Sequence, residues 1–152
     1  AIAVERRHPK GLGRVRMRQL IYPPRQDLIA FGTEVIAPGT VLYSDGEAAY
    51  ATLTERIDIT HEPIVMVHAS DPAHALLPAV HRVASLLKRW LAGTLHDGQS
   101  MAHLDYYLDE FTFRFNRRTS HRRGLLFYRL IQQAVRTDPH PLHELIAPEP
   151  AL

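Results

Sequence analysis

The sequence predicts an α/β fold in which short strands come first and helices gather at the C-terminal side. Two observations lead to this prediction. The N-terminal part contains short apolar or alternating segments separated by turn residues, which is typical of strands. From Val80 onward, apolar residues recur at helical spacing instead. With 152 residues, 45% of them hydrophobic, the chain is long enough for one domain with a sizeable core.

The first segments predict a hairpin followed by a helix. Residues 1–5 are apolar and predict a buried strand, after which proline and glycine indicate a turn. Over residues 13–21, arginines alternate with other residues, which predicts a half-exposed strand with a basic outer face. Residues 25–35 carry apolar side chains at helical spacing, and Pro38 with Gly39 ends that helix.

The middle of the chain predicts two more short strands around a helix. Residues 40–43 are apolar, and a strand there places Asp45 at its C-terminal end. We expect a helix over residues 47–53 and a short strand over residues 57–61. The prolines within residues 63–79 favour a connecting loop.

The C-terminal half predicts three helices. The first starts near Val80 and ends at Gly93, the second starts at Ser100 as its N-cap, and the last covers residues 125–135. The apolar stripes of the first two helices are formed by Val80, Val83, Ala84, Leu87 and Leu91, and by Leu104, Tyr107, Leu108, Phe111 and Phe115.

We expect two parts, a folded part over residues 1–136 and a loosely ordered tail over residues 137–152. The tail contains four prolines, which weaken regular structure. The chain opens on Ala1, inside an apolar strand, which indicates a fragment or a processed chain.

The net charge of +2 hides an asymmetry along the chain. Residues 1–25 and 81–136 each carry a net charge of +6, whereas residues 26–80 carry −7. This pattern suits a protein that binds a polyanion and a cation, although ordinary solvated surface is an equal alternative. Cysteine is absent, which excludes disulfides and thiolate metal sites and favours the cytoplasm. No apolar run of about eighteen residues exists, so we expect no membrane span.

Three features could carry chemistry. Asp45 follows a buried strand, a common ligand position in α/β folds, although it could instead cap the next helix. His81 and Lys88 lie seven residues apart and therefore share a helix face, with a boundary histidine and a solvated lysine as the alternative. The third feature interleaves aromatics with arginines and suits DNA phosphates, unless its arginines are only a solvated helix end. Its candidate DNA contacts are Arg114, Arg117, Arg118, Arg122 and Arg123.

Four stretches resemble one family of proteins. They are residues 43–46 (Tyr-Ser-Asp-Gly) with Tyr50, residues 81–90 with Gly93 and Thr94, residues 106–118 and residues 124–130. These motifs are similar to those of the ISXO-like branch of bacterial insertion-sequence transposases, which are DDE-type enzymes. The resemblance covers most of the chain, from about residue 13 to about residue 135.

The resemblance implies an RNase H-like mixed sheet with C-terminal helices, and two-metal phosphoryl transfer with Mg²⁺ or Mn²⁺. It makes Asp45 the second metal-binding carboxylate. His81 stands where the wider DDE pattern has a third acid, and an imidazole ligand favours Mn²⁺ over Mg²⁺. Lys88 matches the family's basic residue that contacts phosphate. Arg82 and Arg89 are weaker candidates for the same role.

The family's first catalytic aspartate lies in a central strand that precedes residues 1–5, and this chain does not contain it. We therefore expect a DDE transposase domain for DNA cleavage and strand transfer that is inactive as this fragment. The alternatives are a non-catalytic DNA-binding remnant and an RNase H-like nuclease. We expect DNA at element ends and targets as the partner, a homo-oligomer when active, and the bacterial cytoplasm at the nucleoid as the location.

Overall fold

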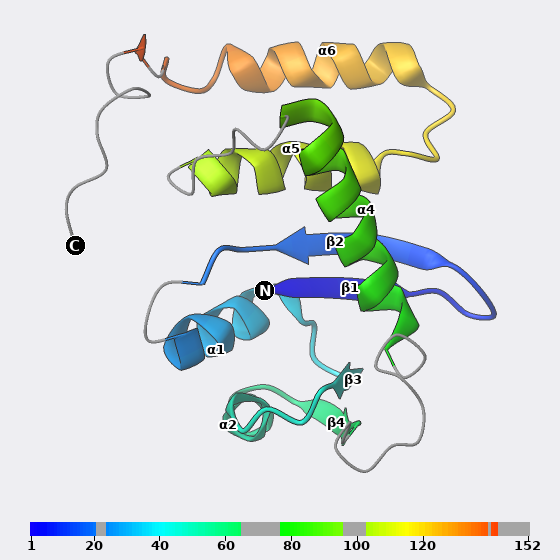
Figure 1. The fold of residues 1–152 in the computed structure, drawn as a ribbon, viewed down its shortest axis with the longest axis vertical. Helices are drawn as coiled ribbons and strands as arrows, with labels where there is room; N and C mark the ends of the chain where they lie inside the picture. The colour runs from blue at the N-terminus through cyan, green and yellow to red at the C-terminus, as the bar shows by residue number, and fades with distance from the viewer. Residues whose placement is uncertain (21–23, 65–76, 96–102, 140, 143–152) are drawn as a thin grey trace. The chain divides into compact units, whose positions relative to one another are not determined.

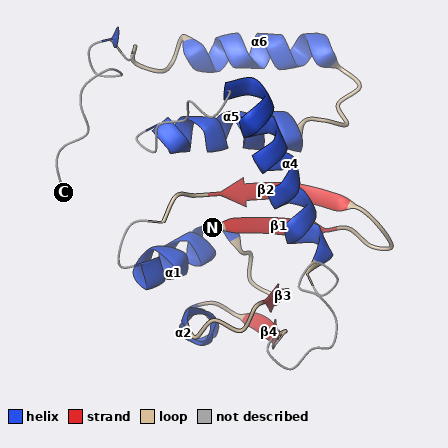
Figure 2. Ribbon diagram, in the orientation of Figure 1, coloured by secondary structure: helices blue, strands red, loops and turns tan. Residues whose placement is uncertain are grey.

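The computed structural model describes residues 1–20, 24–64, 77–95, 103–139 and 141–142 (Figure 1). The described residues form a mixed α/β structure (Figure 2). The chain divides into two compact units, Ala1–Asn116 and Arg117–Leu152. The expected boundary between residues 136 and 137 stays a prediction.

The first two strands form the expected hairpin. β1 (Ile2–Arg6) pairs antiparallel with β2 (Leu12–Met17), and Val4 lies opposite Val15. Val15 is fully buried, whereas Arg14 and Arg16 are exposed, as the alternating sequence predicted.

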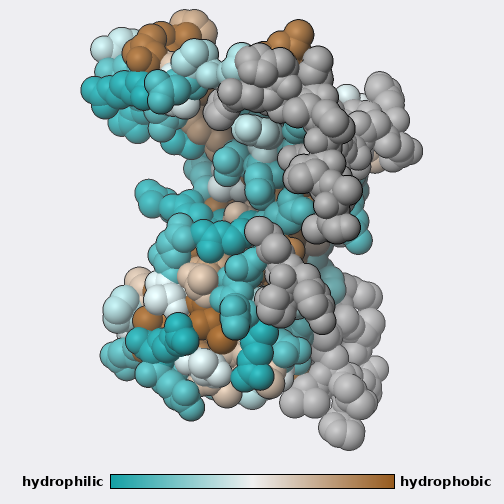
Figure 3. All heavy atoms as spheres, turned by 90° about the vertical axis from the view of Figure 1, so that its left-hand side faces the viewer, coloured by the Kyte–Doolittle hydropathy of each residue, from teal (hydrophilic) through white to brown (hydrophobic). Residues whose placement is uncertain are grey.

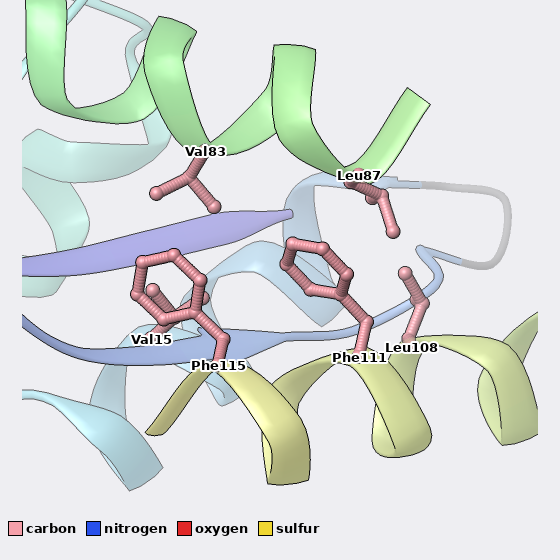
Figure 4. Packing of buried hydrophobic residues seen from close by; sticks show 6 residues of the cluster. All are labelled: Val15, Val83, Leu87, Leu108, Phe111 and Phe115. Atoms are coloured by element: carbon pink, nitrogen blue, oxygen red, sulfur yellow. The ribbon is translucent and has the colours of Figure 1, made fainter. Parts of the chain in front are cut away.

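Two helices build a core against this hairpin. α4 (Pro78–Leu95) and α5 (Leu104–Asn116) carry apolar stripes toward β1 and β2. Figure 4 shows side chains from α4 and α5 pointing toward one another around the strands. The Phe111 ring lies 5.8 Å from both Phe115 and Trp90, measured between ring centroids. The buried core residues are Val15, Val83, Leu87, Leu108, Phe111 and Phe115.

The prediction that Gly93 ends its helix was wrong. α4 continues to Leu95, and Gly93 is not among the glycines with positive φ, so it keeps a helical backbone. A glycine inside a helix costs only about 1 kcal/mol, too little to stop a helix that is held by packing. The predicted N-cap Ser100 lies outside the described residues, as do residues 65–76 of the predicted loop and most of the predicted tail.

The second pair of strands is parallel. β3 (Thr40–Ser44) pairs with β4 (Ile59–Pro63), and α2 (Ala49–Arg56) makes the crossover that a parallel pair requires. α1 (Pro24–Val35) packs on α2. Gly32 permits this approach, because a Cβ there would lie 2.6 Å from Leu53 Cδ2. The buried residues of these two helices are Ile29, Phe31, Gly32, Ala49 and Leu53.

The described strands form two separate two-stranded sheets, β1–β2 and β3–β4. The resemblance implies a single mixed sheet instead. The difference has a direct structural reason, since no strand in the described part of the chain lies between β1 and β3.

The second unit contains α6 (Arg123–Ala134), which has no buried residue. Its apolar side chains lie at the surface, at the top of Figure 3. No described helix is long and apolar enough to cross a membrane.

Candidate functional site

Asp45 follows directly on β3 and is exposed. Gly46 turns the chain with a φ of 82°, a conformation that glycine adopts without strain. The Glu47 N–H donates to Asp45 Oδ1 at 3.4 Å. α2 starts later than predicted, with Ala48 as an N-cap that has no side-chain cap bond. The alternative that Asp45 caps this helix is therefore wrong, and its carboxylate is presented at the end of a strand.

A buried polar pair lies behind Asp45 and fixes the end of β3. Ser44 is only 5% exposed, and its Oγ lies 2.8 Å from Nε2 of His61 on β4. The same Oγ accepts the Gly46 N–H at 3.2 Å. These bonds join β4, the end of β3 and the following turn, so they hold the backbone on both sides of Asp45.

Tyr50 on α2 lies close enough to Asp45 and Glu47 for their charges to change its pKa. Its ring lies 5.5 Å from the His61 ring, measured between centroids. Burial raises the pKa of Tyr50, and the negative charges of Asp45 and Glu47 raise it further. The end of β3 thus carries a negative electrostatic potential, which a neighbouring cation or basic group would partly neutralise.

α4 presents a second group of candidate residues. His81 and Lys88 lie on the same face, opposite the buried Val83 and Leu87. His81 is half-buried and Lys88 is exposed. Arg82 and Arg89 are exposed beside them, so this face offers three cations to a ligand.

The candidate metal ligands do not form a complete centre. Among the described residues, no group of three His, Cys, Asp or Glu side chains could hold a metal ion. Asp45 lines the cavity between β1 and β3, whereas His81 and Lys88 are not among its described lining residues. One carboxylate is too few for Mg²⁺, which requires several oxygen ligands. The donor set present in the described part of the chain therefore does not fit the implied metal site.

The arginines predicted to contact DNA are divided between the two units. Arg114 on α5 is exposed and forms an ion pair with Glu110 at 2.9 Å. In the second unit, Arg118 is exposed, and Arg122 and Arg123 are exposed at the start of α6.

Comparison with known protein families gives a match over most of the chain. The model of the ISXO2-like transposase domain family matches residues 1–116. The chain belongs to this family. No curated protein and no solved structure matches the chain.

The matched range of the ISXO2-like domain coincides with the first compact unit, Ala1–Asn116. The family assignment therefore includes Asp45, His81 and Lys88, together with Arg82, Arg89 and Arg114. The remaining arginine candidates lie beyond the match.

Sequence reasoning missed two polar contacts of this domain. The sequence indicates the Ser44–His61 pair only weakly, because both residues lie at the ends of predicted strands. Asn116 forms two bonds with the backbone of Val15, accepting from its N–H at 2.7 Å and donating to its carbonyl at 2.9 Å. In the sequence, this contact is indicated only by the position of Asn116, a polar residue at the end of a helix rich in aromatic side chains.

Proposed function

We propose that this ISXO2-like transposase domain serves DNA cleavage and strand transfer at insertion-sequence ends, on an RNase H-like fold. The observation that carries the proposal is Asp45, an exposed carboxylate held at the end of β3 without a capping role. Family membership supports the reaction class, which is phosphoryl transfer assisted by Mg²⁺ or Mn²⁺. We further propose residues 1–136 as the domain and residues 137–152 as a tail.

The proposed roles of the other residues follow from their chemistry. His81 would serve as a second metal ligand only where further donors complete the site, and Lys88 contacts phosphate from the exposed face of α4. Arg82 and Arg89 extend this basic face. The remaining proposed DNA contacts are Arg114, Arg117, Arg118, Arg122 and Arg123.

We propose that these 152 residues alone bind DNA without cutting it. The described residues gather no group of three metal donors, and this favours binding over catalysis. Activity then requires a larger homo-oligomeric assembly on DNA, at the nucleoid in the bacterial cytoplasm. An RNase H-like nuclease is the competing function, and it would cut DNA without joining ends.

A salt titration tests the binding proposal. We expect a labelled duplex to bind with an affinity that falls steeply between about 50 mM and 200 mM salt. Substituting Arg82→Ala and Arg89→Ala together should make the slope of log K against log salt less negative by about 2. The matched control is Arg14→Ala with Arg16→Ala, two exposed arginines on β2. Equal changes in both double variants would show that binding follows net charge and not the α4 face.

A plasmid assay with Mg²⁺ or Mn²⁺ tests the proposed lack of cutting. We expect no nicked plasmid from the 152-residue chain. Nicking that disappears in Asp45→Ala would contradict the proposed inactivity and confirm the role of Asp45. If nicked ends are also joined to a second DNA, the activity is transposition, and if they are not, it is that of a nuclease.

A further inference from the structure

α6 exposes an apolar face along its length. Phe127, Leu130, Ile131 and Ala134 recur at intervals of three and four residues, so they share one side of the helix. Phe127 is 68% exposed and Ile131 is 44% exposed, and α6 has no buried residue. Most of the large hydrophobic side chains that are exposed in the described part of the chain belong to residues 125–135. A concentration of apolar side chains of this kind marks an interaction surface.

The other side of α6 is polar. Arg129, Gln132 and Gln133 lie there, and Arg129 stands at the middle of the helix, opposite the centre of the apolar face. The centre of that face can therefore be covered without burying a charge, which would be costly. α6 contains no acidic residue.

The charges at the ends of α6 are the reverse of what an isolated helix favours. Arg122 is the N-cap and Arg123 the first helical residue, while the first turn has no acid and the last turn has no basic residue. The N-terminus is the positive end of the helix dipole, so these cations are unfavourable there. They become favourable beside the negative, C-terminal end of another helix. An antiparallel neighbour brings that end to this place.

The apolar face has the symmetry that pairing with an antiparallel copy of itself requires. With Arg129 as the midpoint, a two-fold axis places Phe127 opposite Ile131 and Gly124 opposite Ala134 of the other helix. Large side chains therefore meet at the middle, and small residues at both ends let the helices approach closely.

We propose that α6 pairs with α6 of a second copy of this chain, antiparallel and around a two-fold axis at Arg129. The pair buries the apolar face of both helices and leaves Arg129 in solvent. Each Arg123 lies at the rim of the interface, beside the C-terminal end of the other α6. The family match ends at residue 116, so this surface lies outside the matched ISXO2-like domain.

Two other occupants would suit a basic amphipathic helix, namely an acidic helix of a different protein and an anionic membrane surface. Neither requires a face that reads alike from both ends, and this symmetry favours the second copy. α6 has 12 residues and is about 18 Å long, so the interface is small and the dimer weak. We expect half of the chains to be dimeric at about 10–100 µM. The pairing does not rest on the proposed function, and its test uses no DNA.

Sedimentation velocity of the full chain, free of DNA, tests the pairing. We expect a monomer at about 1 µM and mainly a dimer at about 500 µM. Phe127→Glu and Ile131→Lys should each be monomeric over this range, because each places a charge against an apolar side chain at the centre of the interface. The matched controls, Gln132→Glu and Gln133→Lys, carry the same charges on the polar face and should dimerise like the unchanged chain. Circular dichroism checks that all four variants keep their helix content.

A mixture of the two monomeric variants identifies both the partner and the direction of pairing. In the antiparallel pair, the new carboxylate at position 127 of one chain faces the new ammonium group at position 131 of the other. Phe127→Glu mixed with Ile131→Lys should therefore dimerise at least about tenfold more tightly than either variant alone. A mixture that stays monomeric, or a dimer that survives both single variants, would overturn the proposal. A chain that is monomeric at every concentration would overturn it too and would point to an acidic helix or a membrane.

Discussion

Two regions of the first unit differ in how well the apolar side chains of their strands are covered. Around β1 and β2, α4 and α5 bury Val15 completely. β3 carries apolar side chains on both faces, and on one of these faces Val41 remains 45% exposed and Tyr43 39% exposed. β2 therefore places arginines on its exposed face, whereas β3 leaves apolar side chains exposed.

The hairpin region contributes mainly to stability, whereas the β3–β4 region carries the candidate site. The hairpin region holds the core cluster, and Asn116 closes its outer edge. The β3–β4 region carries Asp45, and residues 40–45 line the cavity beside β1. Rigid elements commonly support a functional site at a less completely packed boundary. We therefore expect substitutions in the hairpin region to affect mainly stability, and those near β3 to affect mainly binding.

The largest expected effect is on the core. Phe111→Ala should lower the free energy of unfolding by about 3–5 kcal/mol, because it leaves a cavity beside Phe115 and Trp90. Val41→Ala should cost less than about 1 kcal/mol, since its side chain is already partly in water. Urea unfolding measures both, with Phe111→Leu as a milder variant if the alanine variant does not fold. Similar losses at both positions would contradict the division into two regions.

Asn116→Ala should have the next largest effect. It leaves the N–H and C=O of the buried Val15 without partners, and this should cost about 1–3 kcal/mol in unfolding free energy. Arg114→Ala, an exposed change on the same helix, should cost less than about 0.5 kcal/mol. If the two variants were equally stable, water would have to satisfy the edge of β2 in place of Asn116.

The sequence was sufficient to predict most elements of this fold. The hairpin, α1 and β3 carry local signals in their apolar periodicity, and their ends differ from prediction by only a few residues. The start of α2 was predicted two residues too early, because Glu47 is a good helix former that here belongs to the turn after Asp45. The prediction that Gly93 ends its helix was wrong for a related reason, since packing can override the low helix propensity of glycine.

The contacts that define the candidate site were less predictable. Ser44 meets His61 only because the two strands pair in one particular register. Asn116 meets Val15 across 101 positions of sequence. The motifs around Asp45 and His81 indicate their chemistry, but no local pattern tells whether the described residues gather a complete metal site.

A smaller, pH-dependent effect is expected at Tyr50. Its folded pKa is raised above the ordinary value of 10.0, so the folded protein holds this proton more tightly than the unfolded chain. The free energy of unfolding should therefore fall as pH rises through about 10, until the folded pKa is passed. Tyr50→Phe should remove this part of the alkaline loss while keeping the ring against His61.

Asp45→Asn separates the causes of the Tyr50 shift. Burial is the larger cause, so the pKa of Tyr50 should move down toward its ordinary value and still remain above it. Ultraviolet absorbance of tyrosinate, taken as the difference from the Tyr50→Phe variant, measures this pKa. An unchanged pKa would mean that the Asp45 carboxylate lies too far away, or too well solvated, to act on this ring.

The smallest expected effect concerns Arg18, which links the two regions. Its guanidinium pairs with Glu34 of α1 and lies 5.4 Å from the Phe31 ring centroid. Glu34→Gln should cost about 0.2–1 kcal/mol in unfolding free energy, and less at high salt, because the carboxylate side is largely exposed. Arg18→Met also removes the cation–π contact and should cost about 0.5–1 kcal/mol more, a loss that salt changes little. A double-mutant cycle between Arg18 and Glu34 separates the two contacts. If the coupling energy of this cycle were zero, the link between the regions would rest on the Phe31 contact alone.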